Sequence, residues 1–473
     1  MVVGDVTTGT DVLVVGAGPG GYVAAIRAAQ HDFDVTLVER DAYGGTCLNY
    51  GCIPSKAYVS ATDIAHRARE AEHMGIHADP AVDLEGMAEW KDGVVTRLTR
   101  GVEGLCKQAG VNLVEGRAEF AGETTARIVH DGAGEGAETV EFEHAVIATG
   151  SRPVELPGVP FDTEGVVSSK GLLAAESVPE SLVVVGGGYI GMELSTVFAK
   201  LGADVTVVEA LDSVLPAYED DVTAVVRDRA ADLGVEFATG LAATDAEPRP
   251  DDTVRLTAET GTGESRTFDA ERVLVAVGRE PVTDTLNLDA VGLKPTDEGF
   301  LDTDEQCRTA LDHVFAVGDV AGEPMLAHEA SAAGKVAAGA IAGDPTAMDQ
   351  QAIPEVVFTD PEIATVGLTE AEATESGFDP VVGEVPLRSS GRALTLDERE
   401  GFVRVVAAEA GFLLGAQVVA PEASELIAEL GLAVEMGATL EDVAGTVHAH
   451  PTLSESIGEA TEAALSRAIH AAQ

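Results

Sequence analysis

Cysteine and positive charge are both scarce in this chain of 473 residues. Four cysteines are too few for a disulfide-stabilised scaffold. Lysine and arginine total 29 against 81 aspartate and glutamate residues, which gives a formal net charge of −52. Because nucleic acid backbones and anionic lipids carry the same sign, this charge argues against both as partners.

The chain also lacks a long hydrophobic run. Its most apolar window, residues 181–199, holds four glycines and Glu193, and is better explained as strand, turn and helix than as a membrane span. Residues 1–11 carry no basic residue and no continuous apolar stretch. The sequence therefore predicts no secretory signal, and a cytoplasmic location.

The acidic residues are spread along the whole chain instead of being collected in one tail. A surface this acidic repels itself at low ionic strength and needs counterions to stay compact. We interpret the composition as adaptation to a high-salt cytoplasm. The alternative is an acidic protein that has no requirement for salt.

A repeat of 170 residues is present in the first half of the chain. An apolar run over 11–15 leads into Gly16-Ala-Gly-Pro-Gly-Gly21, a helical stretch over 22–30, and a second strand over 34–39 that ends in Glu39. The same order returns as 181–185, Gly186 to Gly191, 192–201 and 204–209, ending in Glu209. The repeat predicts two copies of one structural unit.

Each copy has the pattern of a dinucleotide site. The first glycine of G-x-G-x-x-G permits a tight turn, the second allows the backbone to approach a pyrophosphate, and the third allows close helix–strand packing. The helix N-terminus then faces the phosphates, and the later acid accepts hydrogen bonds from ribose hydroxyls. One such motif is weak evidence, but two copies with matching acids predict two separate sites.

Two further segments resemble each other, Ala148 to Pro153 and Ala276 to Pro281. Each follows an apolar strand, and proline does not continue a ladder, so we expect the chain to leave one nucleotide domain for another there. The alternative is two ordinary turns. A strand predicted over 313–317 follows. Beyond about residue 355, strands over 356–358, 402–406 and 413–419 and helices over 426–436 and 454–470 predict a separate α+β domain. We expect a surface hairpin loop over 131–138.

The cysteines Cys47 and Cys52 lie five residues apart in Gly44-Gly-Thr-Cys-Leu-Asn-Tyr-Gly-Cys-Ile-Pro-Ser-Lys56. In a regular helix their Cα atoms would be about 8–9 Å apart, beyond the usual disulfide range of about 4.4–6.8 Å. A bridge therefore needs an irregular turn, for which Gly51 and Pro54 are suited. Strained bridges are the reducible ones, so the pair indicates redox chemistry. A metal half-site and two inert thiols are the alternatives, and no second ligand cluster completes a zinc set.

The remaining candidates are Cys106 and Cys307, interpreted as ordinary buried thiols, and the segment His448-Ala-His-Pro-Thr-Leu-Ser-Glu455. Pro451 suits the first turn of a helix, which would leave His450 at the helix start. An imidazole there exchanges protons with a thiol near neutral pH, with Glu455 orienting the ring. The alternative is a structural or surface pair.

Together these motifs resemble the flavin-dependent pyridine nucleotide-disulfide oxidoreductases, and within them the dihydrolipoyl dehydrogenases, over essentially the whole chain. The resemblance implies an α/β fold with two Rossmann-like domains, for FAD and NAD, and a C-terminal α+β dimerisation domain. It implies an FAD-binding domain in two parts, residues 1–150 and 281–350, an NAD-binding domain over 151–280, and an interface domain over 351–473.

The resemblance also assigns the cofactor contacts. FAD would lie on the first unit, with its contacts at Gly16, Gly18, Gly21, Glu39, Lys56, Ala118, Asp319 and Ala327. Lys56 would pair with Glu193 of the second unit. NAD would lie on that unit, at Gly186, Gly188, Gly191, Glu209 and Gly278. The carboxylate of Glu209 repels a 2′-phosphate, and no lysine or arginine follows it up to residue 226, which favours NAD over NADP.

The activity implied is oxidation of dihydrolipoamide by NAD, with Cys47 and Cys52 as the redox disulfide and His450, held by Glu455, as the base from the other subunit of a homodimer. A separate lipoyl-bearing protein of a 2-oxoacid dehydrogenase complex or glycine cleavage system, or free dihydrolipoamide, would supply the dithiol. No metal is expected. The alternatives are an NADH-linked reductase of another small disulfide and a non-catalytic flavin- or lipoyl-binding subunit.

Overall fold

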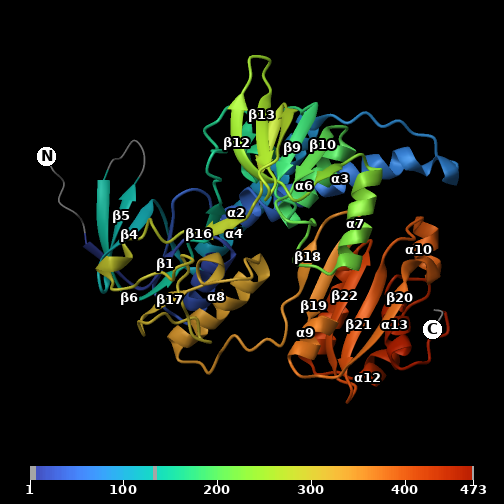
Figure 1. Cartoon of the computed structure of the whole chain (residues 1–473). Coiled ribbons are helices and arrows are strands. Elements are labelled where there is room, and N and C mark those ends of the chain that lie inside the picture. Colours follow the sequence, from blue (N-terminus) through green and yellow to red (C-terminus); the bar gives the residue numbers. More distant parts are fainter. Residues whose placement is uncertain (1–6, 131–135, 471–473) are drawn as a thin grey trace.

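The computed structural model describes residues 7–130 and 136–470, in three parts that the cartoon separates clearly (Figure 1). The first part contains the sheet of β1 (Thr7–Val15), β2 (Val35–Glu39), β3 (Asn112–Glu115), β4 (Arg117–Gly122), β5 (Thr125–His130), β6 (Gly136–Ile147) and β17 (Val314–Ala316). Its order is β3-β2-β1-β6-β5-β4, with β17 also paired to β6. Strands β1 and β2 include the two strands that the sequence predicted, because apolar runs buried on both sides form parallel central strands.

The helices of this part are α1 (Pro19–Gln30), α2 (Gly45–Asn49), α3 (Cys52–Glu70), α4 (Leu84–Ala109) and α8 (Ala327–Ala342), of which α1, α4 and α8 pack together on one face of the sheet. Helices α1 and α8 pack very closely, since a Cβ built on Gly334 would lie 2.4 Å from the carbonyl oxygen of Gly20. The contact holds α8, which comes from the chain beyond residue 281, against the helix that follows the first glycine loop. The sheet is therefore built from two stretches of chain that are separated by the whole second part.

The second part repeats the arrangement. Its sheet has the order β11-β10-β9-β15-β8, all parallel, from β8 (Val166–Val167), β9 (Ser181–Val185), β10 (Asp204–Val208), β11 (Glu236–Ala238) and β15 (Arg272–Val275). It carries α5 (Ser169–Leu173), α6 (Tyr189–Lys200) and α7 (Asp220–Asp232), and a three-stranded antiparallel sheet of β12 (Ala242–Pro248), β13 (Val254–Glu259) and β14 (Ser265–Ala270). The predicted repeat is therefore present in the structure, since each copy is a strand, a helix and a second strand parallel to the first.

The two predicted crossing segments lie side by side. Residues 151–153 form β7 (Ser151–Pro153) and residues 279–281 form β16 (Arg279–Pro281), which pair antiparallel with Arg279 opposite Pro153. The chain therefore leaves and re-enters the first part through one two-stranded ribbon. Pro153 and Pro281 lie inside this ribbon and not beyond it, which is possible because neither strand has a second neighbour that needs the missing N–H.

The third part is the sheet β18-β19-β22-β21-β20, from β18 (Glu355–Val357), β19 (Glu362–Gly367), β20 (Pro380–Pro386), β21 (Phe402–Ala408) and β22 (Leu413–Ala420). Its helices are α9 (Glu370–Glu375), α10 (Gly391–Leu396), α11 (Ala423–Glu435), α12 (Leu440–Ala444) and α13 (Glu455–Ala464). All its strand pairs are antiparallel. The expected α+β character is present, and the four domain boundaries stay predictions.

Two expectations about local structure are wrong. The last helix is shorter than the predicted 454–470, because Ser466 adopts a positive φ of 58°, which a helix does not continue through. The same helix begins at Glu455, so Pro451 is in the preceding loop and not in its first turn. For the hairpin expected over 131–138, β5 and β6 pair up to His130 and Gly136, and residues 131–135 lie outside the described residues.

Candidate active site

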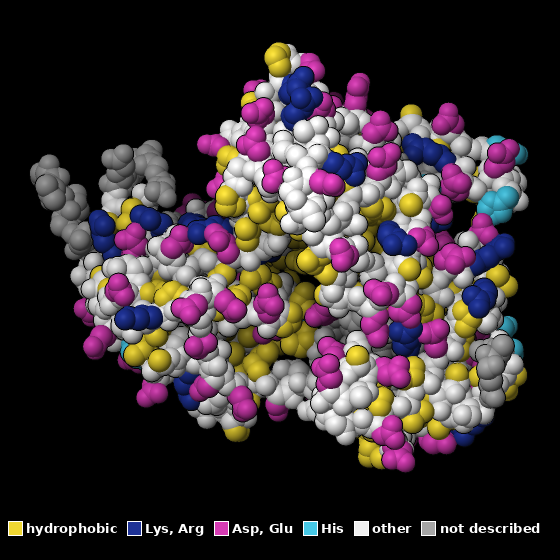
Figure 2. All heavy atoms as spheres, viewed as in Figure 1, with side chains coloured by type: hydrophobic (Ala, Val, Ile, Leu, Met, Phe, Trp, Pro, Cys, Tyr) yellow, Lys and Arg dark blue, Asp and Glu magenta, His cyan; other side chains and the backbone are white. Residues whose placement is uncertain are grey.

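A deep cleft opens at the carboxyl ends of the strands in the first sheet, where α/β proteins bind ligands. It encloses about 1630 Å³ of empty space including its mouth. Its lining includes the glycine loop at Gly16, the cysteines Cys47 and Cys52, and Arg279, an arrangement that suits an extended dinucleotide reaching from the loop to the sulfurs. The space-filling view shows a hollow lined by apolar side chains between the parts, while acidic side chains are spread over the rest of that face (Figure 2).

The glycine loop at the bottom of the cleft has the geometry that a pyrophosphate requires. A Cβ on Gly16, whose φ is +101°, would lie 2.3 Å from the carbonyl oxygen of Ala148, and one on Gly21 would lie 1.8 Å from that of Gly16. A Cβ on Gly18 would meet no atom within 4 Å, so this residue faces open space at the start of α1. The loop is therefore a cradle open toward the cleft, and it fits the phosphates of FAD.

The glycine loop of the second part has almost the same geometry. Gly186 also has a φ of +101°, and a Cβ on it would lie 2.5 Å from the oxygen of Ala276. A Cβ on Gly191 would lie 2.0 Å from the oxygen of Gly186, while one on Gly188 would meet nothing. Gly278, with a φ of +141°, lies in the turn after β15, beside this loop. This second cradle fits NAD.

Glu39 and Glu209 are held alike at the two loops. Glu39 accepts hydrogen bonds from the backbone N–H groups of Ala17, at 2.7 Å, and Asp41, at 2.8 Å. Glu209 accepts from Gly187 and Leu211 at the same two distances. Because these bonds fix each carboxylate beside its loop, each is oriented to receive the ribose of a nucleotide bound there.

Cys47 and Cys52 lie on the wall of the cleft, in two different helices. Cys47 belongs to the short helix α2, Cys52 is the first residue of α3, and the helical path is broken at Tyr50 and Gly51. This break is the irregular turn that the spacing required. The two side chains are free thiols, and each shifts the pKa of the other.

The surroundings of the pair make the two sulfurs unequal. The hydrogen bond with Cys47 is the main cause that lowers the pKa of Cys52 to about 7, and the positive charge of Lys56 acts in the same direction against the effect of burial. The same hydrogen bond, with burial, raises the pKa of Cys47. The position of Cys52 at a helix N-terminus is also typical of thiolates. Cys52 is thus the sulfur that carries negative charge near neutral pH.

Lys56 lies where all three parts of the chain meet. Its ammonium group is 2.7 Å from the carboxylate of Glu193, which is 4% exposed and belongs to α6. The other oxygen of Glu193 accepts a hydrogen bond from the backbone N–H of Phe358, and Lys56 lies 4.5 Å from the centre of the Phe358 ring. The expected Lys56–Glu193 pair is therefore present, and it is fixed by the third part of the chain.

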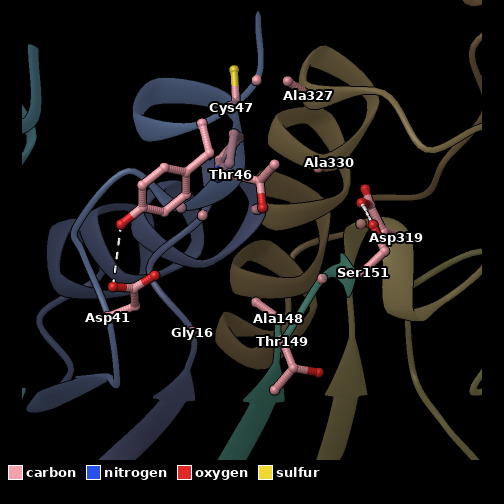
Figure 3. Close-up of a pocket in the computed structure, with 18 of the residues that line it drawn as sticks. Gly16, Asp41, Thr46, Cys47, Ala148, Thr149, Ser151, Asp319, Ala327 and Ala330 are labelled. Atoms are coloured by element: carbon pink, nitrogen blue, oxygen red, sulfur yellow. Dashed lines mark hydrogen bonds between the residues drawn. The ribbon is translucent and has the colours of Figure 1, made fainter. Parts of the chain in front are cut away.

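Three other expected contacts line the same cleft. Ala118 comes from β4, Asp319 from the short 3-10 helix Gly318–Val320, and Ala327 from the first turn of α8. Figure 3 shows Cys47 and Ala327 close together, with Asp319 beside Ser151. Ser151 donates its hydroxyl proton to Asp319, and Arg279 donates to the hydroxyl oxygen of Ser151 at 2.7 Å.

The sequence reasoning missed some residues at this site. Ser151, Arg279 and Tyr50 line the cleft and lie inside segments that were singled out for other reasons. The sequence could have pointed to them, because Ser151 follows Gly150, Arg279 follows Gly278, and Tyr50 lies between the two cysteines. Phe358 had no signal at all, because it reaches Lys56 only through the packing of separate parts.

Of the four expected catalytic residues, Cys47 and Cys52 line this cleft, whereas His450 and Glu455 do not. Nδ1 of His450 lies 2.9 Å from Glu455, and the imidazole is 82% exposed. A hydrogen bond from the backbone of Thr452, followed by that from His450, lowers the pKa of Glu455. Within one chain, the pair is therefore assembled but separate from the thiols.

Other observations limit the remaining chemistry. Cys106 and Cys307 are 0% and 4% exposed, and burial raises the pKa of each thiol. Among residues 7–130 and 136–470, no group of three histidine, cysteine or acidic side chains is placed to hold a metal. Over the same residues, no helix has both the length and the apolar character that crossing a membrane requires.

Comparison with known proteins identifies the family. Residues 10–334 match the model of the pyridine nucleotide-disulphide oxidoreductases, and residues 353–461 match their dimerisation domain. The chain is 66% identical to dihydrolipoyl dehydrogenase 2 of Haloarcula marismortui over 99% of this chain and 100% of that protein. It is 64% identical to dihydrolipoyl dehydrogenase of Halobacterium salinarum over 99% of both chains. These haloarchaeal relatives agree with the expected adaptation to salt.

A solved structure has the same fold over nearly the whole chain. The crystal structure of LpdA from Mycobacterium tuberculosis superposes with a TM-score of 0.89 at 30% identity, covering 96% of this chain and 99% of that one. The dimerisation domain accounts for the third part of the fold, and the two glycine cradles account for FAD and NAD. The chain belongs to the pyridine nucleotide-disulphide oxidoreductase family, within its dihydrolipoyl dehydrogenases.

Proposed function

We propose that this chain oxidises a dihydrolipoyl dithiol to the cyclic lipoyl disulfide with NAD⁺ as the final acceptor, acting as a homodimer. The observation that carries the proposal is the thiol pair in the dinucleotide cleft, with a pKa near 7 for Cys52 beside Lys56. A sulfur with this pKa leaves readily as a thiolate at neutral pH.

The sulfur steps follow from that asymmetry, starting from the oxidised Cys47–Cys52 bridge. His450 takes a proton from one substrate thiol, and the thiolate attacks the sulfur of Cys47. The Cys47–Cys52 bond breaks, and Cys52 leaves as a thiolate stabilised by Lys56. The second substrate thiol then attacks the mixed disulfide at the substrate sulfur, which closes the lipoyl ring and releases Cys47 as a thiol.

FAD held by the first glycine loop, Glu39 and Lys56 would supply a two-electron acceptor for the sulfurs and a hydride donor for NAD⁺. As Cys52 gives up the electron pair, its bond with Cys47 forms again and the proton of the Cys47 thiol is released, which restores the oxidised bridge. The chain's own residues orient and separate the two cofactors. Lys56 and Glu193 hold the sulfur side of the cleft, while Glu39 and Glu209 face the two riboses. Glu455 fixes the ring of His450 so that one nitrogen is free to exchange the substrate proton.

The base is proposed to act across the dimer, since His450 is exposed and lies away from the thiols of its own chain. Complementation tests this directly. Cys47→Ser and His450→Gln homodimers should both be inactive. Random mixed dimers from equal amounts should regain about a quarter of the parent activity, because half the dimers then hold one complete site out of two. No recovery would place both residues in one chain and refute the dimeric site.

Substrate choice is tested by assaying dihydrolipoamide and reduced glutathione with NAD and NADP in turn. We expect turnover of dihydrolipoamide with NAD. Failure with dihydrolipoamide under all conditions, together with NADH-dependent reduction of another small disulfide, would refute the lipoyl assignment. Finding neither activity in a protein that binds FAD would indicate a non-catalytic subunit.

The carrier of the dithiol is proposed to be a separate lipoyl-bearing protein of a 2-oxoacid dehydrogenase complex or glycine cleavage system, or free dihydrolipoamide. The strongly acidic surface favours a partner with a basic docking segment. We also propose a cytoplasmic location, because the reaction consumes NAD⁺ and the surface charge suits a concentrated salt solution. Cell fractionation with an antibody to the chain tests the location.

A further inference from the structure

Three side chains from three separate segments meet at the rim of the cleft. Tyr50 lies in the turn between the two cysteines, Asp41 follows β2, and Lys170 belongs to α5. The hydroxyl of Tyr50 donates to Asp41 at 3.2 Å, and the ammonium group of Lys170 lies 3.6 Å from the centre of the Tyr50 ring. Lys170 is also 3.5 Å from Asp41, so each side chain contacts the other two.

The position of this trio relates it to the bound dinucleotide. Asp41 and Tyr50 line the cleft together with Ser169 and Leu173 of α5. Figure 3 shows Asp41 and its hydrogen bond next to the glycine loop at Gly16. Asp41 and Lys170 are each 55% exposed, so the trio joins the two sides of the cleft at its outer edge.

We propose that Tyr50, Asp41 and Lys170 form a clasp that closes the rim of the FAD cleft and slows release of the bound dinucleotide. The inference rests on FAD occupying this cleft. A ligand seated on the glycine loop leaves only when the rim opens, and opening breaks a cation–π contact, a hydrogen bond and an ion pair. The tyrosine is the central element, because its hydroxyl bonds to Asp41 and its ring contacts Lys170, whereas the ion pair between the two half-exposed groups is weakened by concentrated salt.

The clasp also involves the redox turn. Tyr50 lies between Cys47 and Cys52 in the chain, and its ring connects that turn to a helix about 120 residues later. The contact therefore holds the turn against α5 as well as covering the cofactor. Nothing in the sequence pattern of the glycine loops requires a tyrosine there.

The test measures FAD release from holoenzyme at a fixed high concentration of KCl, as the rise in flavin fluorescence after dilution. Lys170→Met removes the cation and should speed release about 2- to 5-fold. Tyr50→Phe keeps the ring and loses the hydrogen bond, so its release should rise about 2- to 4-fold. Tyr50→Leu removes both and should speed release about 5- to 20-fold.

The matched control is Arg255→Met, which removes an exposed Arg255–Asp269 pair of 2.7 Å on β13 and β14, away from the cleft. Its release rate should equal that of the parent. Equal rates for the parent and the clasp variants, or an equal acceleration in the control, would overturn the clasp. A parent chain that binds no FAD would instead overturn the proposed function, and Lys170→Met keeps the test decisive if Tyr50→Leu does not fold.

Discussion

Replacing Gly18 or Gly188 by alanine should remove one cofactor and leave the fold and the other cofactor intact. Both residues precede a helix, with φ values of −67° and −72° that alanine also adopts. A Cβ on either meets no protein atom within 4 Å. The gain through the unfolded state, up to about 1 kcal/mol, is opposed by the poor preference of alanine for the N-cap position, so the stability of the apo chain should change by less than about 1 kcal/mol.

The loss of cofactor affinity can be estimated from what the new methyl group displaces. It would occupy the open space where the loop meets a pyrophosphate, and would push the phosphates away from the helix N-terminus. Losing one or two hydrogen bonds to a charged group, at about 1.5–3 kcal/mol each, costs about 3 kcal/mol. That is roughly a 150-fold weaker Kd.

Two assays separate the sites. Gly18→Ala should be purified with little flavin, as measured by visible absorbance, and should need added FAD for activity. Gly188→Ala should keep its flavin and show a KM for NAD⁺ raised roughly 100-fold. The control is Gly21→Ala, whose Cβ would lie 1.8 Å from a carbonyl oxygen and should lower the thermal midpoint of the apo chain. If either Gly18→Ala or Gly188→Ala lost both cofactors together, or if Gly188→Ala kept the parent KM, two independent cradles would be the wrong description.

Three further predictions follow from charge. Because the pKa of Cys52 is lowered to about 7, alkylation of the reduced enzyme by iodoacetamide should accelerate as pH rises through 7. Lys56→Met should move the midpoint of this pH profile upward, and an unmoved midpoint would contradict the role of Lys56. Lys200→Met should lower the free energy of unfolding by about 3 kcal/mol, since the ammonium group is 3% exposed and lies 2.6 Å from Asp63 and 2.7 Å from Asp360. Calorimetry in concentrated KCl checks this, and a thermal midpoint equal to that of the parent would refute it. Dialysis into millimolar salt should reduce both activity and thermal midpoint because a net charge of −52 loses its counterions; full retention of both would show that salt is not required.

A cluster of ion pairs joins the second part of the chain to the third. Arg404 of β21 is 9% exposed and hydrogen-bonds Glu219 and Asp221 at the start of α7, together with Glu384 of its own sheet. The Arg404 side chain is only 11% exposed, although its three carboxylate partners are 35–53% exposed, so salt screens these partly buried pairs less than it screens fully exposed ones. They hold the second part against the third at the ionic strength that the acidic surface requires.

The sequence determined the features that depend on neighbours along the chain. The two glycine loops, their strands and helices, and the acids Glu39 and Glu209 follow from local backbone geometry, because a tight turn before a helix needs glycine at fixed offsets. The irregular turn at Cys47 and Cys52 follows from the reach of a disulfide. The same reasoning placed Pro451 in a helix, wrongly, because nothing local fixed the start of that helix at Glu455.

Only the tertiary structure decided which distant groups meet. The contact of Lys56 with Glu193 spans 137 residues and was expected only through the family resemblance, while Phe358 and Tyr50 act through partners on separate parts of the chain. No pattern along the sequence encodes such contacts, since they depend on how three independently built sheets pack. The same packing leaves the side chain of His450 82% exposed, so the proposed role of this residue as the base for the sulfurs requires a second copy of the chain.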